Sequence, residues 1–382
     1  MTPAARAAAA ISVLDRILGG EPAEQALTNW GRASRYAGSG DRAAVRDLVF
    51  QALRCRRSYA ALGGGEHGRG LILGHFRAEG IDPAAIFTGE AHAPAVVGDE
   101  PGTAPQGNAA LDCPDWLAPR LQQSLGAGFA PVMTALRQRA PVFLRVNLAR
   151  TDLPGAQAAL AAEGIATQLS PLAKTALEVT ENARKIQNSQ PYLQGLVELQ
   201  DAASQAVVQA LPLADGMRVL DLCAGGGGKT LAMAALARLK LFAHDASPAR
   251  MRDLPDRARR AGVKVTLTDK PEKTAPYDLI LTDVPCSGSG SWRRDPQGKW
   301  ALDEAKLTAL AGVQAAILRR AAAMVAPGGH LAYATCSLLE EENAGRIAGF
   351  LAETPGWRLL HQLRLTPLDG ADGFYLALLA RG

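Results

Sequence analysis

Two cysteines carry the strongest indication of chemistry in this sequence. Cys286 lies in the run DVPCSGSG and Cys336 in the run YATCS, and each follows an apolar stretch typical of a buried strand. Both lie downstream of a glycine-rich run, VLDLCAGGGGKT, at residues 219–230. Because strand ends in an open α/β sheet border one ligand crevice, we expect the two thiols to meet over a single substrate.

An ionised thiol is a good nucleophile, and the most useful carbon for it to attack here is C6 of a pyrimidine. That addition turns C5 into a carbon nucleophile, which can take a methyl group from a sulfonium donor. The base must first leave its stack, and an aromatic or guanidinium surface can receive it. Two tryptophans and two arginines that follow Cys286 are candidates for that surface: Trp292, Arg293, Arg294 and Trp300. The alternative for either cysteine alone is tight packing at a strand end.

The glycine-rich run predicts a buried strand, a glycine turn and a helix start, which together bring backbone N–H groups close to a ligand. Its glycines are contiguous from Gly225 to Gly228, so it matches neither a phosphate-binding P-loop nor a dinucleotide fingerprint. The next expected strand ends at Asp245, about 20 residues on, where a carboxylate can accept hydrogen bonds from ribose hydroxyls. Asp269 follows the third strand and is expected either to border an adenine or to cap a turn. This spacing favours a nucleoside-bearing cofactor.

The composition is that of a globular protein of two or three domains, with 382 residues, 48% of them hydrophobic, and a net charge of +4. Five cysteines without a CxxC pair argue against a disulfide framework and a structural zinc site, and Cys55 and Cys113 are expected to be buried. No apolar stretch approaches the roughly 18 residues of a membrane span. Arg6 and Asp15 make the N-terminal stretch a poor signal peptide. We expect a cytoplasmic monomer without a bound metal.

Residues 1–107 are predicted to form an all-α domain that ends in a linker. Its expected helices are Ala4–Leu18, Pro22–Arg35 and Asp41–Leu62, with Asp41 as an N-cap and a linker at Ala91–Gly107. Arginines concentrate between Arg32 and Arg57, which is compatible with RNA binding or with a solvated helix face.

Residues 108–190 are predicted to form a small α+β subdomain, and residues 191–382 a doubly wound α/β domain. The subdomain is expected to contain strands at 141–147, 166–169 and 176–179 and a helix at 153–163. In the C-terminal domain strands alternate with helices; the expected strands are 218–223, 241–244, 263–267, 279–282, 331–335, 357–363 and 374–380. Such alternation predicts a mostly parallel sheet.

Residues 191–381 resemble the catalytic domain of the S-adenosylmethionine-dependent RNA (cytosine-5)-methyltransferases. The motifs that carry the resemblance are LQDAASQ (199–205), DLCAGGGGKT (221–230), HDAS (244–247), TDVPCSGSGSWRRDP (282–296), YATCSLLEEEN (333–343) and DGFYLALL (372–379). The whole chain resembles the bacterial members that act on small-subunit ribosomal RNA. The run RVN at 145–147 resembles their small RNA-contacting subdomain, and residues 1–70 resemble their NusB-like RNA-binding domain. The resemblance implies a Rossmann-like class I methyltransferase domain with a seven-stranded sheet.

The resemblance also implies a role for individual residues. Cys336 is the nucleophile that attacks C6, Cys286 assists release of the methylated product, and Asp283 holds the cytosine at N3 and the amino group and borders the cofactor. Asp245 is implied to bind the ribose of S-adenosylmethionine and Asp269 to lie near its adenine. The loop implied to hold the cofactor comprises Cys223, Ala224, Gly225, Gly226, Gly227, Gly228 and Lys229. The residues implied to contact RNA are Lys229, at the rim of the active site, Arg145, Asn147, Arg293 and Arg294.

One departure and three alternatives accompany this interpretation. The family loop reads CAAPGGK, whereas here Gly225 and Gly226 replace Ala-Pro, and the lost proline restraint predicts weaker cofactor binding, by roughly 0.4–1 kcal/mol. A DNA cytosine-5 methyltransferase would use Cys286 as its nucleophile instead of Cys336. Transfer RNA is an alternative substrate, and a non-catalytic RNA-binding assembly factor is an alternative function.

Overall fold

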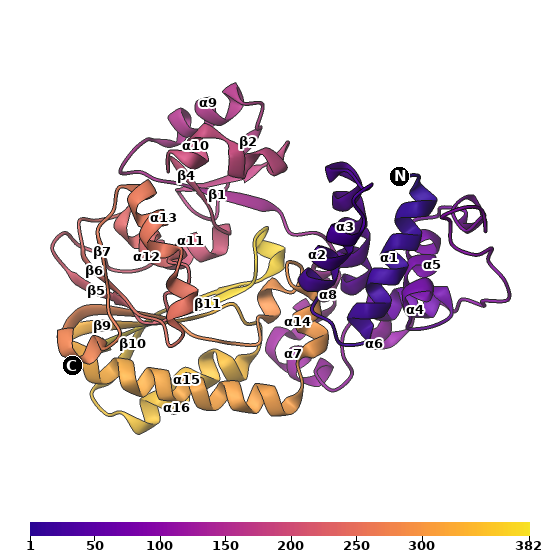
Figure 1. The fold of residues 1–382 in the computed structure, drawn as a ribbon. Helices are drawn as coiled ribbons and strands as arrows, with labels where there is room; N and C mark the ends of the chain where they lie inside the picture. Colours follow the sequence, from indigo (N-terminus) through magenta and orange to yellow (C-terminus); the bar gives the residue numbers. More distant parts are fainter. The chain divides into compact units, whose positions relative to one another are not determined.

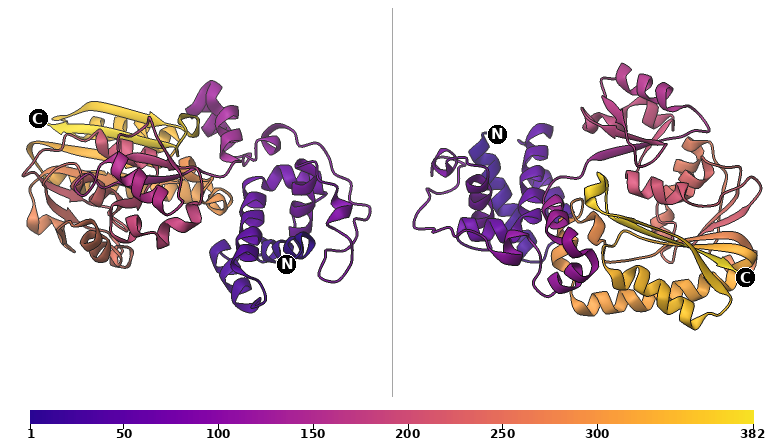
Figure 2. Two further views of the ribbon diagram at one scale, coloured as in Figure 1. Left: turned by 90° about the horizontal axis from the view of Figure 1, so that it is seen from above. Right: turned by 180° about the vertical axis from the view of Figure 1, so that it is seen from behind.

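The chain forms two compact units, which the computed structural model describes over all residues, 1–382. The first, helical unit comprises Met1–Arg139 together with Trp292–Ala301, and the second comprises Ala140–Ser291 and Leu302–Gly382. Figures 1 and 2 show the helices of the first unit and the two sheets of the second. The predicted boundaries at 107 and 190 stay predictions.

The helical unit confirms the all-α prediction for the N-terminal region. Its helices are α1 (Pro3–Leu18), α2 (Ala23–Ala33), α3 (Ser39–Arg54), α4 (Arg56–Gly63), α5 (Gly68–Ala78), η1 (Pro83–Ala85), α6 (Gly107–Ala110), α7 (Ala118–Leu125), η2 (Gly126–Gly128), α8 (Phe129–Leu136) and α14 (Pro296–Ala301). Apolar side chains at helical spacing on α1, α3 and α5 form its core, including Leu14, Leu53 and Leu71.

The third predicted helix is two helices, because the chain turns at Cys55 between α3 and α4. Asp41 is not the N-cap: Gly38 takes that position, and the Asp41 carboxylate instead accepts hydrogen bonds from the N-terminal ammonium and Arg6. Cys55 and Cys113 are buried as predicted, and burial raises the pKa of Cys113 to about 11. Neither is therefore ionised at neutral pH.

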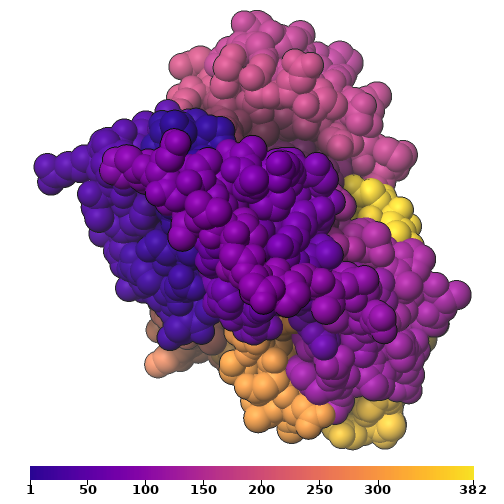
Figure 3. All heavy atoms as spheres, turned by 90° about the vertical axis from the view of Figure 1, so that its right-hand side faces the viewer, coloured from indigo at the N-terminus to yellow at the C-terminus, as the bar shows by residue number.

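The segment 91–107, predicted as a linker, is free of helix and strand as far as α6, and its role as a linker stays a prediction. Its residues are mostly exposed, and Figure 3 shows this purple stretch on the surface of the helical unit. None of the helices in the structure combines the length and apolar character that a bilayer crossing needs.

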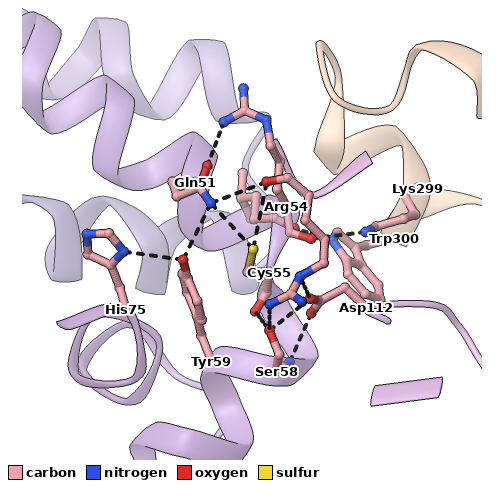
Figure 4. A network of polar contacts seen from close by, with 11 residues as sticks. Gln51, Arg54, Cys55, Ser58, Tyr59, His75, Asp112, Lys299 and Trp300 are labelled. Atoms are coloured by element: carbon pink, nitrogen blue, oxygen red, sulfur yellow. Dashed lines mark hydrogen bonds and ion pairs between the residues drawn. The ribbon is translucent and has the colours of Figure 1, made fainter. Parts of the chain in front are cut away.

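The segment 292–301 is part of the helical unit, although it follows the Cys286 motif in sequence. Figure 4 shows how α14 is held there: Lys299 Nζ donates to the Arg54 carbonyl (3.1 Å) and Trp300 Nε1 donates to the Leu53 carbonyl (2.7 Å). These bonds satisfy carbonyls at the C-terminus of α3 that have no partner within the helix. Burial lowers the pKa of Lys299 to about 8. Nearby, Ser58 donates two hydrogen bonds to the buried Asp112 carboxylate.

The second unit opens with the predicted α+β region, a four-stranded antiparallel sheet in the order β2-β3-β1-β4. The elements are β1 (Val142–Val146), α9 (Leu153–Ala162), β2 (Thr167–Leu169), β3 (Ala176–Val179), η3 (Ala183–Asn188), α10 (Gln190–Leu193) and β4 (Val197–Leu199). Strand β4 was not predicted, because its three residues are too few to show the apolar alternation of a strand.

The seven-stranded sheet confirms the doubly wound prediction, with strand order β10-β11-β9-β8-β5-β6-β7. The pairs among β5 to β9 are parallel, and β11 runs antiparallel between β9 and β10. The strands are β5 (Arg218–Asp221), β6 (Lys240–Ala243), β7 (Val265–Leu267), β8 (Tyr277–Asp283), β9 (Val325–Thr335), β10 (Trp357–Leu365) and β11 (Phe374–Arg381). The helices are α11 (Ala202–Gln209), α12 (Gly228–Ala234), η4 (Pro248–Met251), α13 (Leu254–Ala261), η5 (Pro271–Thr274), η6 (Ser289–Ser291), α15 (Glu304–Met324), η7 (Glu340–Glu342), α16 (Ala344–Glu353) and η8 (Pro367–Asp369).

Alternate residues of the central strands enter two different cores, as the period of two in a strand requires. Val219, Leu279 and Leu281 pack toward α11 and α12, whereas Leu220 and Ile280 pack toward α15 and α16. Figures 1 and 2 show these helices on opposite faces of the sheet. With both faces covered, the ligand-binding edge is the carboxyl end of β5, β6, β8 and β9.

Candidate active site

The structure brings the two motif cysteines into contact. Strands β8 and β9 are parallel neighbours, so the loops that carry Cys286 and Cys336 leave the same edge of the sheet. The Cys286 Sγ lies 3.5 Å from the Cys336 Sγ, and both thiols are partly buried. The two thiols therefore meet, as predicted, and their place at a substrate crevice stays a prediction.

The surroundings of the two thiols shift the pKa of Cys336 and the pKa of Cys286 in opposite directions. A hydrogen bond from the Cys286 thiol lowers the pKa of Cys336, against burial and the negative charge of Asp283, and the Lys229 ammonium also lowers it. The pKa of Cys286 is raised, first by its hydrogen bond with Cys336, then by burial and by the charges of Cys336 and Glu342. The arrangement thus favours a thiolate on Cys336 and a neutral thiol on Cys286.

Lys229 and Asp283 form an ion pair beside the thiols. Lys229 is the second residue of α12, and its Nζ lies 2.6 Å from the Asp283 Oδ2 at the end of β8. The ammonium also lies 4.7 Å from the centre of the Phe374 ring. Only 8% of Lys229 is exposed, so the residue lies inside the site; its predicted place at the rim is wrong. Asp283 and Cys336 raise the pKa of Lys229 against the effect of burial, so its charge persists.

The four-glycine run forms a tight turn between β5 and α12, and its backbone requires glycine at two positions. Gly225 has φ +49° and Gly227 has φ +82°, in the left-handed region that side chains disfavour. A Cβ on Gly227 would lie 2.1 Å from a methyl carbon of Leu254, which means that α13 packs directly on the turn. Burial raises the pKa of Cys223, so this thiol is not a nucleophile.

Asp245 fixes the loop at the end of β6. Its carboxylate accepts hydrogen bonds from the N–H of Gly225 (2.9 Å) and of Ser247 (2.9 Å). Asp269 follows β7 and is exposed, and no hydrogen bond or ion pair of its side chain is identified. A glycine turn at a helix start with an acidic residue at the end of the next strand has the donors and acceptors that a nucleoside-bearing cofactor needs. The residues present therefore fit S-adenosylmethionine.

Arg145 and Asn147, predicted to contact RNA, are turned into the protein. Only 4% of Arg145 is exposed, and its guanidinium donates to the Gln200 side chain and to the Gly228 carbonyl of the glycine loop. The buried Asn147 amide donates to the carbonyls of Gly195 and Ala261. Both side chains hold the four-stranded sheet against the elements around the seven-stranded sheet, Arg145 at the glycine loop and Asn147 at the end of α13.

The predicted surface for a flipped base does not form as expected. Trp292 and Arg293 are 2% and 5% exposed, and the Trp300 N–H is already bonded within the helical unit. Arg294 is exposed, so it is the member of this group that faces solvent.

Two buried carboxylates near the site were not predicted as site residues. Glu342, fully buried, accepts hydrogen bonds from both cysteine loops. Asp221, the last residue of β5, accepts a hydrogen bond from Thr230. Both lie within the motifs already quoted, but nothing in residue type or spacing marks either carboxylate as buried beside the site. Only burial distinguishes them.

Comparison with known proteins covers most of the chain. Residues 208–379 match the family model described as 16S rRNA methyltransferase RsmB/F, and residues 113–187 match the RsmF/B-like ferredoxin-like domain. A ribosomal RNA small subunit methyltransferase B from Klebsiella pneumoniae is 34% identical over 284 residues, which cover 70% of this chain and 66% of that protein. The corresponding protein of Vibrio vulnificus is 33% identical over 283 residues. The match thus spans just under two thirds of the length of these relatives.

Solved structures share the fold. The crystal structure of PH0851 has a TM-score of 0.80 at 23% identity and covers 99% of both chains. A methyltransferase homologue from Pyrococcus horikoshii has a TM-score of 0.63 at 26% identity, covering 71% of this chain and 96% of its own. These likenesses agree with the methyltransferase sheet order described above.

Proposed function

The chain belongs to the RsmB/F family of ribosomal RNA methyltransferases, and on that premise we propose that it methylates C5 of a cytosine in RNA, with small-subunit ribosomal RNA as substrate. S-adenosylmethionine is the methyl donor of this methyltransferase family. The observation that carries the proposal is the pair of thiols in contact at 3.5 Å, with Asp283 and Lys229 beside them. No reaction at an oxygen or an exocyclic amine needs such a pair.

In the proposed reaction the Cys336 thiolate forms a bond to C6 of the cytosine, and the electron pair of the C5–C6 double bond moves to C5. The bound S-adenosylmethionine supplies an electrophilic methyl group there. After C5 carries the methyl group it loses its proton to a base, the double bond re-forms, and the C6–sulfur bond breaks. The Cys336 sulfur leaves with that electron pair as a thiolate. Cys286 stabilises this leaving thiolate through the hydrogen bond that it donates to the sulfur.

Asp283 and Lys229 are proposed to handle the charge that moves onto the ring. The Asp283 side chain is 31% exposed, so one side of its carboxylate is open to accept a hydrogen bond from the cytosine amino group. Lys229 holds that carboxylate in place and keeps a positive charge beside the thiols. Its buried position supports a role in preserving the thiolate, instead of a contact with the RNA backbone.

The residues proposed to hold S-adenosylmethionine are the loop 223–229 with Asp245, Asp269 and Asp283. Asp245 has one carboxylate oxygen on the Gly225 N–H and the other on the Ser247 N–H, and each oxygen retains a lone pair for a ribose hydroxyl. We propose that Arg145 supports this loop from beneath, through the Gly228 carbonyl, in place of the RNA contact expected from sequence.

Trapping on RNA that contains 5-azacytidine tests the covalent mechanism. Its C5 position is a nitrogen without a proton, so the enzyme cannot complete release. Cys336→Ala should abolish the RNA–protein adduct on denaturing gels, while Cys286→Ala should retain it and accumulate it with normal RNA. An adduct that depends on Cys286 would instead support the DNA-type assignment, and identical behaviour of both variants would contradict the division of roles.

Two further measurements identify the cofactor and the substrate. Calorimetry with S-adenosylmethionine should detect binding, whereas a protein that binds none at millimolar concentration is an RNA-binding assembly factor. Bisulfite sequencing of total RNA from cells without this gene should lack one methylcytosine of small-subunit ribosomal RNA. A missing methylcytosine in transfer RNA would reassign the substrate.

A further inference from the structure

The two cysteine loops are tied together by one buried carboxylate, that of Glu342. It ends the short helix η7, which follows the Cys336 loop, and none of its surface is exposed. Its Oε1 accepts hydrogen bonds from the Ser287 N–H (2.9 Å) and the Gln314 amide (2.9 Å). Its Oε2 accepts hydrogen bonds from the Ser287 hydroxyl (2.5 Å) and the Ser337 hydroxyl (2.5 Å).

These donors are the residues next to the reactive thiols. Ser287 directly follows Cys286, and Ser337 directly follows Cys336. The Ser289 hydroxyl lies 3.2 Å from that of Ser337 and accepts the N–H of Leu338, so it joins the same two loops. One carboxylate therefore holds the serine that follows each cysteine, and the two cysteines are fifty residues apart in sequence.

A buried carboxylate has an electrostatic consequence as well as a structural one. It lies on the Cys286 side of the pair through two bonds to Ser287, and its negative charge disfavours an anion on Cys286. The cation of the site, Lys229, favours an anion on Cys336. The two charges act in the same direction on the proton that the thiols share.

We propose that Glu342 is a positioning residue that keeps the two thiols in contact and assigns the shared proton to Cys286, so that Cys336 is the nucleophile. This inference rests on the proposed cysteine mechanism. In addition to that mechanism, Glu342 determines which of the two adjacent thiols attacks. Glu342 need not touch the substrate for this role, since it acts through the loops and the charge of the pair.

Glu342→Gln tests the proposal because it removes the charge and changes little else. Its amide oxygen can accept the Ser287 and Gln314 donors, and its NH₂ can donate to the two serine hydroxyls, which accept as readily as they donate. Glu341→Gln is the matched control, because it removes the same charge from the neighbouring, exposed position.

The measurement is the rate of alkylation of each thiol by iodoacetamide as a function of pH, without RNA or cofactor. The two cysteines fall in separate tryptic peptides, 274–293 and 321–346, so mass spectrometry follows each one. In the unaltered protein Cys336 should react faster than Cys286. Glu342→Gln should lower the ratio of the two rates roughly tenfold, the effect of about one pKa unit on the thiolate fraction, and Glu341→Gln should leave it unchanged. An unchanged ratio in a folded Glu342→Gln variant would overturn the proposal.

Ser337→Ala provides a second variant should Glu342→Gln not fold. It retains the charge and removes the one bond that holds the Cys336 loop to the carboxylate. Phenylarsine oxide, which bridges two thiols only when they are close, should bind this variant more weakly than the unaltered protein. Equal binding of phenylarsine oxide to the variant and to the unaltered protein would refute the proposal that Glu342 keeps the two thiols in contact. Neither assay involves methylation. A protein that does not methylate RNA could therefore still give both expected results, and one that does methylate RNA could give neither.

Discussion

Asp221 makes the sharpest prediction about stability, because the sheet buries its carboxyl group without full compensation. The residue ends β5 with 1% of its surface exposed. Its Oδ2 accepts a hydrogen bond from the Thr230 hydroxyl (2.6 Å), and its Oδ1 has no hydrogen-bond partner within the protein. Burial raises the pKa of Asp221 from 3.8 to about 6, and the charges of Asp283 and Asp245 add to the rise.

The sign of the pH effect follows from this raised pKa. Below pH 3.8 the carboxyl is protonated in both states, and its contribution to stability is fully present. As the pH rises toward 6 the unfolded chain ionises first, which favours unfolding, so the contribution is lost across that window. A pKa difference of about 2 units corresponds to roughly 3 kcal/mol lost by pH 7.

Asp221→Asn removes this titration. The asparagine oxygen can still accept the Thr230 hydrogen bond, and its buried amide N–H adds a cost that does not depend on pH. The free energy of unfolding of the variant, relative to the unaltered protein, should therefore rise by roughly 3 kcal/mol between pH 4 and pH 7. Urea denaturation followed by circular dichroism at unit steps of pH measures it.

The control is Asp215→Asn, at an exposed carboxyl whose pKa is lowered by hydrogen bonds from Arg238. Because that substitution removes a favourable charge, the free energy of unfolding of Asp215→Asn, relative to the unaltered protein, should not rise with pH. A difference between Asp221→Asn and the unaltered protein that stays constant within about 0.5 kcal/mol, the range of ordinary surface substitutions, would refute the reasoning.

Three further predictions concern the glycine loop and the thiol pair. Gly227→Ala should destabilise the protein by roughly 2–4 kcal/mol, because of strain at φ +82° and overlap with α13, and should weaken S-adenosylmethionine binding in calorimetry. Gly225→Ala should cost only about 1 kcal/mol, because the nearest atom to its Cβ would be 3.5 Å away. Equal effects of the two substitutions would contradict this prediction. Gly226→Pro should tighten cofactor binding about 2- to 5-fold by restraining the free loop, and unchanged or weaker binding would refute it. Lys229→Met should move the alkylation of Cys336 to higher pH, because its ammonium lowers the pKa of that thiol, and an unshifted profile would exclude this role.

Local patterns were sufficient to predict the elements of the methyltransferase sheet. All seven of its strands were expected from apolar runs, and their observed order is that of a doubly wound sheet. The predictions failed where a contact distant in sequence decides the outcome. The capping site expected at Asp41 is instead an ion pair with the ammonium group of Met1. Propensity within one segment contains no information about such partners.

The same division applies to the site. The sequence by itself determined which residues are chemically competent: two thiols, an acidic residue after each of two strands, and a glycine turn at a helix start. These follow from residue type and from the rule that strand ends gather at one edge. Neither residue type nor the position of strand ends determined which side chains are buried or where they point. Arg145 and Trp292 were therefore expected on a surface, whereas the fold encloses both.

Residue spacing left the two thiols equivalent and the family resemblance implied their roles, but only the tertiary structure shows how their surroundings differ. In sequence Cys286 and Cys336 are equivalent as nucleophiles, each preceded by a strand and followed by a serine. The fold puts the Lys229 cation near Cys336 and the Glu342 anion at the loop of Cys286, and these charges act strongly because burial limits their screening by water. The proposed division of roles thus depends on the packed site, since charge and burial act through space and are independent of chain order.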